Sequence, residues 1–259
     1  MARIYPLFSS SKGNATFIGT PSGGILIDAG VSAKRLRDAL SRAGIPAEAV
    51  EAVFVTHDHS DHVSGLRVFC RQTGAPVYAE PQTLENLLRC GYVDPDADVH
   101  PLTVPVTACG LIVSPFATSH DTEKSCGYRI TFPDGQSCAV CTDLGYAPES
   151  VQQALCGCRL VLLEANYDDT MLRYGPYPEY LKARIRSNSG HLSNVQSGQL
   201  ARFLIESGTV HLVLGHLSEH NNTPEKAEQA VIGALGGYVR GQDYLLDIAK
   251  PEDGRMIVF

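Results

Sequence analysis

The densest group of reactive side chains in this sequence lies directly after the apolar run Ala52–Val55. It holds three imidazoles and two carboxylates within six residues, namely His57, Asp58, His59, Asp61 and His62. Such a group is costly to place at the end of a buried strand unless a cation binds it, and imidazole and carboxylate are ordinary zinc ligands. We interpret this cluster as the first half of a metal site.

The spacing within the cluster predicts two partial sets of ligands. His57 and His59 are two residues apart, so their rings can face the same ion if the segment is extended. Asp61 and His62 lie beyond the point where the chain should turn into a helix, and can face a second ion. Two ions need more ligands than the cluster supplies.

Polar residues that end other apolar runs are the candidates for the missing ligands. Six such runs end at or near a carboxylate or an imidazole: Asp28, His57, His120, Asp143, Glu164 and His216. Open α/β folds place their sites at such strand ends. We therefore assign His57, His59 and His120 to one ion, Asp61, His62 and His216 to the other, and Asp143 as the bridge. Taken alone, His120 or His216 would be an ordinary solvated or hydrogen-bonded residue. His100, His211 and His220 keep that interpretation.

The elements that must position these residues alternate between strands and helices. Helices are predicted from about Ala33 to Ala43, from Val63 to Gly74, from Pro81 to Gly91, after the Ser193/Gln196 capping box, and over Ala227 to Leu235 behind Thr223-Pro224. Strands are predicted at residues 3–8, 15–19, 25–28, 52–56, 76–79, 111–118, 127–132, 137–142, 159–163 and 210–215. Residues 92–110 show no clear pattern. Because no stretch is typical of a linker, residues 1–259 are expected to form a single domain.

Composition narrows the class of protein. The formal charge of −7 disfavours a broad nonspecific nucleic-acid surface, although a local basic patch remains open. No apolar segment is long enough for a signal peptide or a membrane span, so we expect a cytoplasmic protein without a membrane partner. The eight cysteines are expected to be reduced. Cys138 and Cys141 should point to opposite faces of a strand, which disfavours a CxxC metal site.

The pattern His57-x-His59-x-Asp61-His62, followed by a separate histidine, a strand-ending aspartate and a late histidine, resembles the metallo-beta-lactamase superfamily. The WalJ (YycJ)-like branch is the more specific resemblance, carried by the motifs at residues 9–14, 163–166, 177–178, 190–194, 215–218 and 221–222. The resemblance implies a four-layer α/β/β/α sandwich with a dinuclear metal site on one edge. It also implies a metal-dependent phosphodiesterase or nuclease, with 5′-to-3′ DNA exonuclease activity attributed to the branch.

Within that hypothesis, a hydroxide bridging two divalent ions attacks a phosphodiester. Zinc is the expected ion, and manganese or iron would also suit the His/Asp ligands. We expect Asp61 to orient the nucleophile, His191 to contact a phosphate oxygen or act as general acid, and Asp28 and Glu164 to hold ligand imidazoles in one tautomer. The alternative for His191 is packing beside the Ser193 cap.

The substrate is expected to be nucleic acid, with DNA favoured over RNA. Arg184 and Arg186 are the candidate phosphate contacts within a basic segment that also holds Arg173 and Lys182; a solvated helix face is the alternative. The competing enzymatic hypothesis is hydrolysis of a carboxylic ester, lactone or thioester, as in glyoxalase II-like proteins. The third hypothesis is a protein that binds metal ions without catalysing a reaction.

Overall fold

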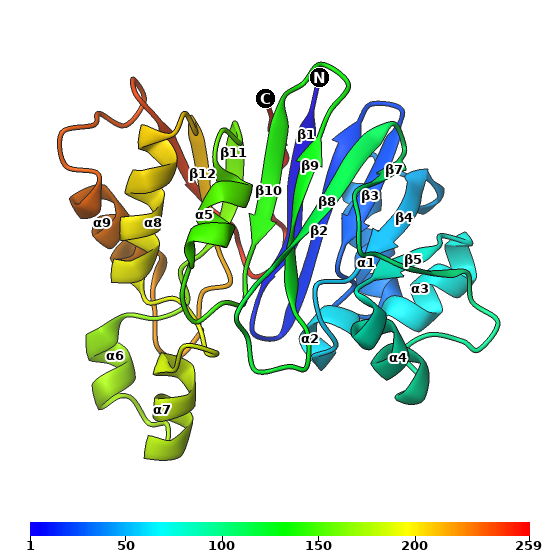
Figure 1. Ribbon diagram of the computed structural model, residues 1–259, viewed down its shortest axis with the longest axis horizontal. Helices are drawn as coiled ribbons and strands as arrows, with labels where there is room; N and C mark the ends of the chain where they lie inside the picture. The colour runs from blue at the N-terminus through cyan, green and yellow to red at the C-terminus, as the bar shows by residue number, and fades with distance from the viewer.

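The computed structural model describes residues 1–259, whose strands form two sheets of seven (Figure 1). The first sheet has the order β14-β1-β2-β3-β4-β5-β6. Its strands are β1 (Arg3–Ser10), β2 (Gly13–Thr20), β3 (Gly23–Ile27), β4 (Val50–Phe54), β5 (Val77–Ala79), β6 (Val99–Pro101) and β14 (Ile257–Val258). The strands from β14 through β3 pair antiparallel, and those from β3 to β6 pair parallel.

The second sheet has the order β13-β12-β11-β10-β9-β8-β7. Its strands are β7 (Val106–Ala108), β8 (Leu111–Ala117), β9 (Cys126–Thr131), β10 (Ser137–Cys141), β11 (Leu160–Glu164), β12 (His211–Gly215) and β13 (Leu245–Ile248). The pairs from β10 to β13 are parallel, whereas those from β7 to β10 are antiparallel. Both sheets are therefore mixed.

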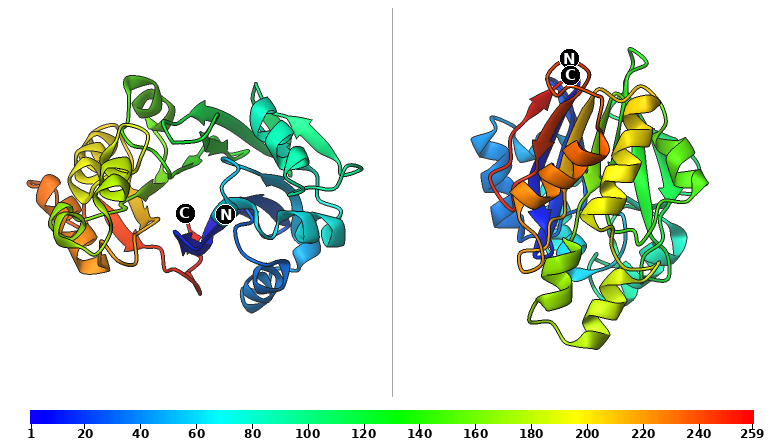
Figure 2. Two further views of the ribbon diagram at one scale, coloured as in Figure 1. Left: turned by 90° about the horizontal axis from the view of Figure 1, so that it is seen from below. Right: turned by 90° about the vertical axis from the view of Figure 1, so that its left-hand side faces the viewer.

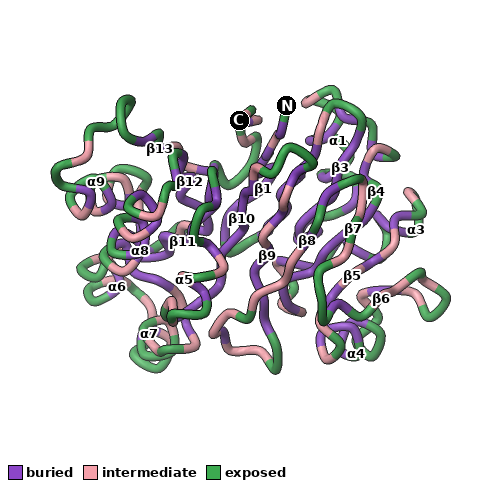
Figure 3. Tube along the Cα trace, turned by 45° about the horizontal axis from the view of Figure 1, so that its top comes forward, coloured by how far each residue is buried: buried purple, intermediate pink, exposed green.

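The two sheets pack face to face. Their buried strands are apolar on both faces, so one face packs against the other sheet and the opposite face packs against helices. In β3, Ile25 and Ile27 lie in the core between the sheets, together with Tyr128 and Leu162 of the second sheet. Leu26, between those two isoleucines, belongs to the outer core of its sheet. Side chains alternate across a strand, so both faces of each sheet must be covered. Figure 3 shows the strands as mostly buried, in purple.

Helices cover both outer faces. On the first sheet lie α1 (Ala33–Arg42), α3 (Leu66–Thr73) and α4 (Pro81–Arg89), and on the second α5 (Glu149–Leu155), α8 (Asn194–Glu206) and α9 (Pro224–Ala234). The two groups lie on opposite sides in Figure 2. The remaining helical elements are η1 (Ala47–Ala49), α2 (Ser60–Val63), α6 (Asp169–Tyr174) and α7 (Glu179–Arg186). The predicted four-layer α/β/β/α sandwich is confirmed.

The predicted helix ends hold where capping residues mark them. Ser193 and Gln196 form the expected capping box at α8, and Thr223 caps α9 with Pro224 in its first turn. The helix expected from Val63 to Gly74 is broken into α2 and α3 at Gly65. A Cβ on Gly65 would lie 1.9 Å from the carbonyl oxygen of Val31, so the chain approaches too closely for any other residue. Short strands β6 and β7 lie in the unassigned region 92–110.

Cys138 and Cys141 face opposite sides of β10, as predicted: the former lies between the sheets and the latter under the helices. None of the helices combines the length and apolar character needed to cross a membrane.

Candidate metal centre

The site lies at the edge of the sandwich where the strands β3, β4, β8, β10, β11 and β12 have their carboxyl ends. We call this the site edge. All six polar residues expected to follow these strands lie there. Five of them belong, with the residues after His57, to overlapping groups, and within each group the possible ligand atoms lie within 4.8 Å of one another. The sixth, Asp28, lies behind His62 and belongs to no group.

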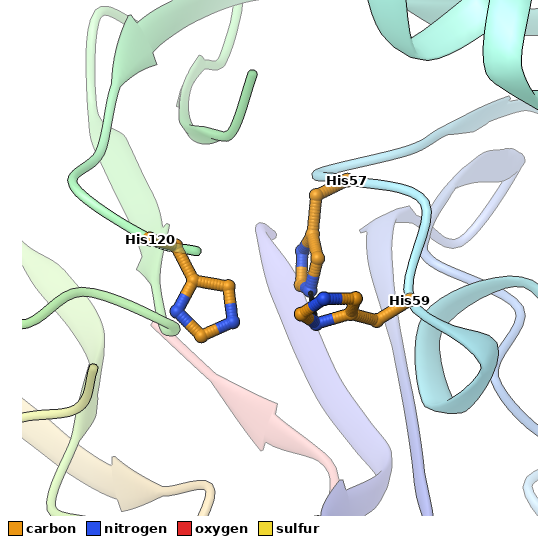
Figure 4. Close-up of side chains that lie close together, drawn as sticks. All are labelled: His57, His59 and His120. Carbon is orange, nitrogen blue, oxygen red and sulfur yellow. Dashed lines mark hydrogen bonds between the residues drawn. The ribbon is translucent and has the colours of Figure 1, made fainter. Parts of the chain in front are cut away.

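His57, His59 and His120 form the first group (Figure 4). The segment after β4 stays extended until α2 begins at Ser60, so His57 and His59 point to the same side. Nε2 of His57 lies 3.1 Å from Nδ1 of His59. The His120 ring, from the segment after β8, lies 5.0 Å from the His57 ring centroid. Nδ1 of His120 donates to the carbonyl oxygen of Gly190 at 3.0 Å, which leaves its Nε2 free.

Asp61, His62 and His216 form the second group. The first turn of α2 carries Asp61 and His62, and Oδ2 of Asp61 lies 3.5 Å from Nε2 of His62 and 3.8 Å from Nε2 of His216. Gly30 allows this arrangement, because a Cβ there would lie 1.7 Å from the carbonyl oxygen of Asp61.

Asp143 lies between the two groups. Its Oδ2 is 3.3 Å from Nε2 of His62, and its Oδ1 is 3.8 Å from Nε2 of His120. The Oδ2 of Asp143 and the Nε2 of His216 are buried and have no hydrogen-bond partner. Buried polar atoms are nearly always satisfied, so two unpartnered ligand atoms in one cluster fit a site for cations. The residues present therefore suit divalent metal ions.

Two buried carboxylates hold the imidazoles of the second group from behind. Oδ2 of Asp28 accepts from Nδ1 of His62 at 2.8 Å, and Oε1 of Glu164 accepts from Nδ1 of His216 at 2.9 Å. Each contact places the ring proton on Nδ1 and directs Nε2, the nitrogen without a proton, toward the cluster. Asp28 also accepts hydrogen bonds from the backbone N–H and hydroxyl of Thr56.

Three of these strand-ending residues adopt the left-handed backbone region, with φ of 61° at Asp28, 58° at Asp143 and 55° at His216. This conformation costs on the order of 1 kcal/mol or more for a residue other than glycine and is tolerated best by Asp, Asn and His. The sharp turn lets each side chain point into the site edge immediately after its strand.

The electrostatics of the cluster are strongly coupled. Burial alone would lower the pKa of His62, but Asp28, Asp143 and Asp61 outweigh it and raise that pKa to about 9. Burial also raises the pKa of Asp28, and this outweighs the lowering by His62 and Thr56. In contrast, burial and the neighbouring imidazoles hold the pKa of His57 well below its usual value. His191 and His216 overcome the effect of burial on Glu164 and lower its pKa.

The structure places His191 in this cluster and not at the helix cap. Its Nδ1 lies 2.8 Å from Oε1 of Glu164 and 3.7 Å from Oδ1 of Asp143. The side chain retains 21% of its exposure, in contrast to the buried imidazoles of His62 and His216. With Nδ1 directed at Glu164, the second ring nitrogen is available to a ligand.

Two site residues were missed by the sequence analysis. Asp121 follows His120, and its buried, unpartnered Oδ1 lies 3.4 Å from Nε2 of His120 and 3.7 Å from Nε2 of His59. Asn14 lies at the start of β2, in the β1–β2 hairpin, and its amide nitrogen lies 3.1 Å from Nε2 of His62. The available signals were the His120-Asp121 dipeptide and the polar motif at residues 9–14.

The residues of the basic segment have different environments in the structure. Arg184 donates from Nε to Asp121 while its side chain remains 56% exposed, and Arg186 is exposed. Lys182 cannot track phosphates as part of this patch, because its buried amine donates to the carbonyl oxygen of Arg173 and to Glu179. His211 binds Asp247 at the opposite end of β12, and His100 lies beside Asp98.

Fold and site together define a metal-dependent hydrolase with a dinuclear-type His/Asp site. The chain belongs to the beta-lactamase superfamily, since the sequence model of the Beta-lactamase superfamily domain matches residues 24–217. Among characterised proteins, it is 34% identical to the exodeoxyribonuclease YycJ of Bacillus anthracis, over 88% of this chain and 87% of the relative. It is 33% identical to the exodeoxyribonuclease WalJ of Streptococcus pneumoniae, over 88% and 86%.

A solved structure supports the fold. The metallo-beta-lactamase fold protein YhfI from Bacillus subtilis superposes with a TM-score of 0.75 over 99% of this chain and 98% of that protein, at 18% identity.

Proposed function

We propose that this protein is a metal-dependent nuclease, specifically a 5′-to-3′ DNA exonuclease. The observation that carries the proposal is the 34% identity, over 88% of the chain, to an exodeoxyribonuclease. The arrangement of the His/Asp groups supports it, because two adjacent cation sites suit in-line displacement at a phosphodiester.

Each ion would take three ligands of its own and share Asp143. His57, His59 and His120 would hold the first ion, and Asp61, His62 and His216 the second. The grouping of these atoms within 4.8 Å supports the assignment, as do the unpartnered atoms of Asp143 and His216. We propose zinc for both positions, while manganese and iron also suit nitrogen and oxygen ligands.

Bound at these positions, the ions would supply an acidic water and stabilise charge on the phosphoryl oxygens. The chain's own residues prepare the site for this chemistry. Asp28 and Glu164 fix the tautomers of His62 and His216, and Asp61 is placed to accept a hydrogen bond from a water at the second site. The contacts already described support these proposed roles.

His191 is proposed to act on the substrate. Its Nδ1 donates to Glu164 at 2.8 Å, so Nε2 is the atom that would contact a phosphate oxygen or donate a proton to the leaving oxygen. The hydrogen bond to Glu164 also fixes the orientation of the ring.

Arg184 and Arg186 are proposed to contact phosphates. Both side chains are exposed on α7, and the ion pair with Asp121 holds Arg184 beside His120. A guanidinium bound through Nε keeps its terminal nitrogens for a second anion.

Parallel assays on 5′-labelled and 3′-labelled DNA, on RNA, on bis(p-nitrophenyl) phosphate and on a thioester panel test the proposal. We expect zinc-dependent removal of nucleotides from the 5′ end of DNA. Hydrolysis of thioesters alone would refute the nuclease assignment and favour the glyoxalase II-like alternative. Release from the 3′ end would refute only the polarity.

A further inference from the structure

The helical pair α6 and α7 projects beyond the site edge of the sheets (Figures 1 and 2). Little apolar packing holds it, since Leu172 is the buried residue of α6 and Lys182 that of α7. The amine of Lys182 braces the pair by donating at 2.9 Å to the carbonyl oxygen of Arg173, at the end of α6, and at 3.0 Å to Glu179, at the start of α7. Lys182 therefore joins the two helices, and most of their side chains remain accessible.

Each helix of this pair carries one strongly exposed tyrosine. Tyr174 at the end of α6 and Tyr180 in α7 are each 78% exposed. The guanidinium carbon of Arg173 lies 5.8 Å from the Tyr174 ring centroid, so a cation accompanies that ring. Nothing in the fold requires a phenol ring at either position, whereas exposed aromatic rings beside arginines are the usual means of stacking unpaired bases.

The C-terminal end of α7 is fixed to the metal centre. Its last turn carries Arg184, which binds Asp121. In the following loop, the carbonyl oxygen of Gly190 accepts from Nδ1 of His120 and that of Asn188 accepts from the Ser119 hydroxyl. Tyr180 and Arg184 are four residues apart in one helix and so share a face, with a rise of about 6 Å between them. Tyr180 thus lies about one helical turn from Arg184.

We propose that Tyr174 and Tyr180 form a stacking platform for the bases of a single-stranded nucleic acid whose phosphate lies at Arg184. The platform would hold the strand behind the nucleotide undergoing cleavage. Single strands fit this surface and duplexes do not, because base faces are available for stacking only when unpaired. The inference rests on the proposed nuclease function but concerns residues outside the metal centre.

Binding of fluorescent single-stranded DNA to the zinc-loaded protein tests the platform, using a phosphorothioate oligonucleotide that resists cleavage. We expect Tyr174→Ala/Tyr180→Ala to weaken binding about tenfold or more, and Tyr174→Phe/Tyr180→Phe to retain wild-type affinity, because phenylalanine still stacks. Val104→Ala, which shortens an exposed apolar side chain between β6 and β7, is the matched control. Thermal unfolding and zinc content establish that each variant is folded.

An oligonucleotide with abasic sites in place of the stacked bases completes a double-mutant cycle. Wild-type protein should bind it about tenfold more weakly than the intact oligonucleotide, and the double alanine variant should bind both equally. Equal losses for the alanine and phenylalanine variants, or additive losses from alanine and abasic sites, would overturn the platform. Should the double variant unfold, Tyr180→Ala and Tyr180→Phe are compared in the same cycle. If the wild-type protein binds DNA in this way but cleaves only thioesters, the nuclease proposal fails while the platform stands.

Discussion

Replacing Asp28 by asparagine should remove the second ion while leaving the first ligand group in place. Asp28 uses both oxygens: Oδ1 accepts from the Thr56 backbone N–H at 2.8 Å, and Oδ2 accepts from Nδ1 of His62 at 2.8 Å. Asparagine tolerates the same left-handed backbone but has only one oxygen. If that oxygen keeps Thr56, the amide NH₂ faces His62, whose ring proton must move to Nε2. The ligand atom is then blocked.

The magnitude follows from these contacts. Loss of a carboxylate that orients a ligand histidine lowers metal affinity by about 10- to 100-fold. The fold should lose only about 1–3 kcal/mol, because one buried charged acceptor is replaced by a group that satisfies part of the network. His57, His59 and His120 do not contact Asp28, so the first ion should remain.

Equilibrium dialysis against zinc, followed by elemental analysis, gives both stoichiometry and affinity. We expect two zinc ions per wild-type chain and one tightly bound ion in Asp28→Asn. Asp94→Asn is the matched control, since it makes the same chemical change at an ion pair with Arg67 and Arg71, on the outer surface at α3. Two zinc ions bound by Asp28→Asn with wild-type affinity would refute the orienting role.

Three further outcomes are expected. His191→Ala should retain two zinc ions and lose about 10²- to 10⁴-fold in rate; loss of zinc would instead make it a ligand. Arg184→Ala/Arg186→Ala should weaken DNA binding and flatten its salt dependence, and an unchanged salt slope would exclude phosphate contacts. The pKa of His62 is raised to about 9, so its protonated ring stabilises the metal-free fold. This stabilisation is complete below pH 6.5 and is lost as the pH rises through 9. Zinc must displace that proton, so zinc affinity measured by chelator competition should rise with pH up to about 9, and a flat profile would contradict this.

The site edge was predictable from the sequence because the buried strands end abruptly in polar residues. Apolar runs such as Leu160–Leu163 leave little doubt about where the strand lies, and parallel strands bring their carboxyl ends to one edge. This reasoning predicts ligands that directly follow a buried strand. It did not single out Asp121, because His120 directly before it already serves as the polar residue that ends the strand, and the contact of Asp121 with Arg184 of α7 is a tertiary one.

The sequence also did not predict elements that lack a clear hydrophobic periodicity. Strands β6 and β7 have three residues each, too few to show alternation, and they lie among prolines and aspartates. The break between α2 and α3 depends on the close approach of Gly65 to Val31, a tertiary contact that helical spacing does not encode. Asn14 was missed for a different reason: a polar stretch with Gly and Asn between two predicted strands is typical of a hairpin turn and needs no further role.

The loop between α7 and α8 connects the chemistry of the site to its proposed substrate contacts. It begins after Arg186, supplies the Gly190 carbonyl oxygen that orients His120, and continues directly into His191. A strand of DNA bound along α7 would therefore press on the same short segment that aligns a metal ligand and the proposed acid. Because this loop contacts Ser119 and His120 directly, we expect a displacement of α7 to shift His120 and His191 as well. Substrate binding at α7 and the geometry of the metal centre should thus be coupled, which gives a physical reason for a basic helix at this place in an otherwise acidic protein.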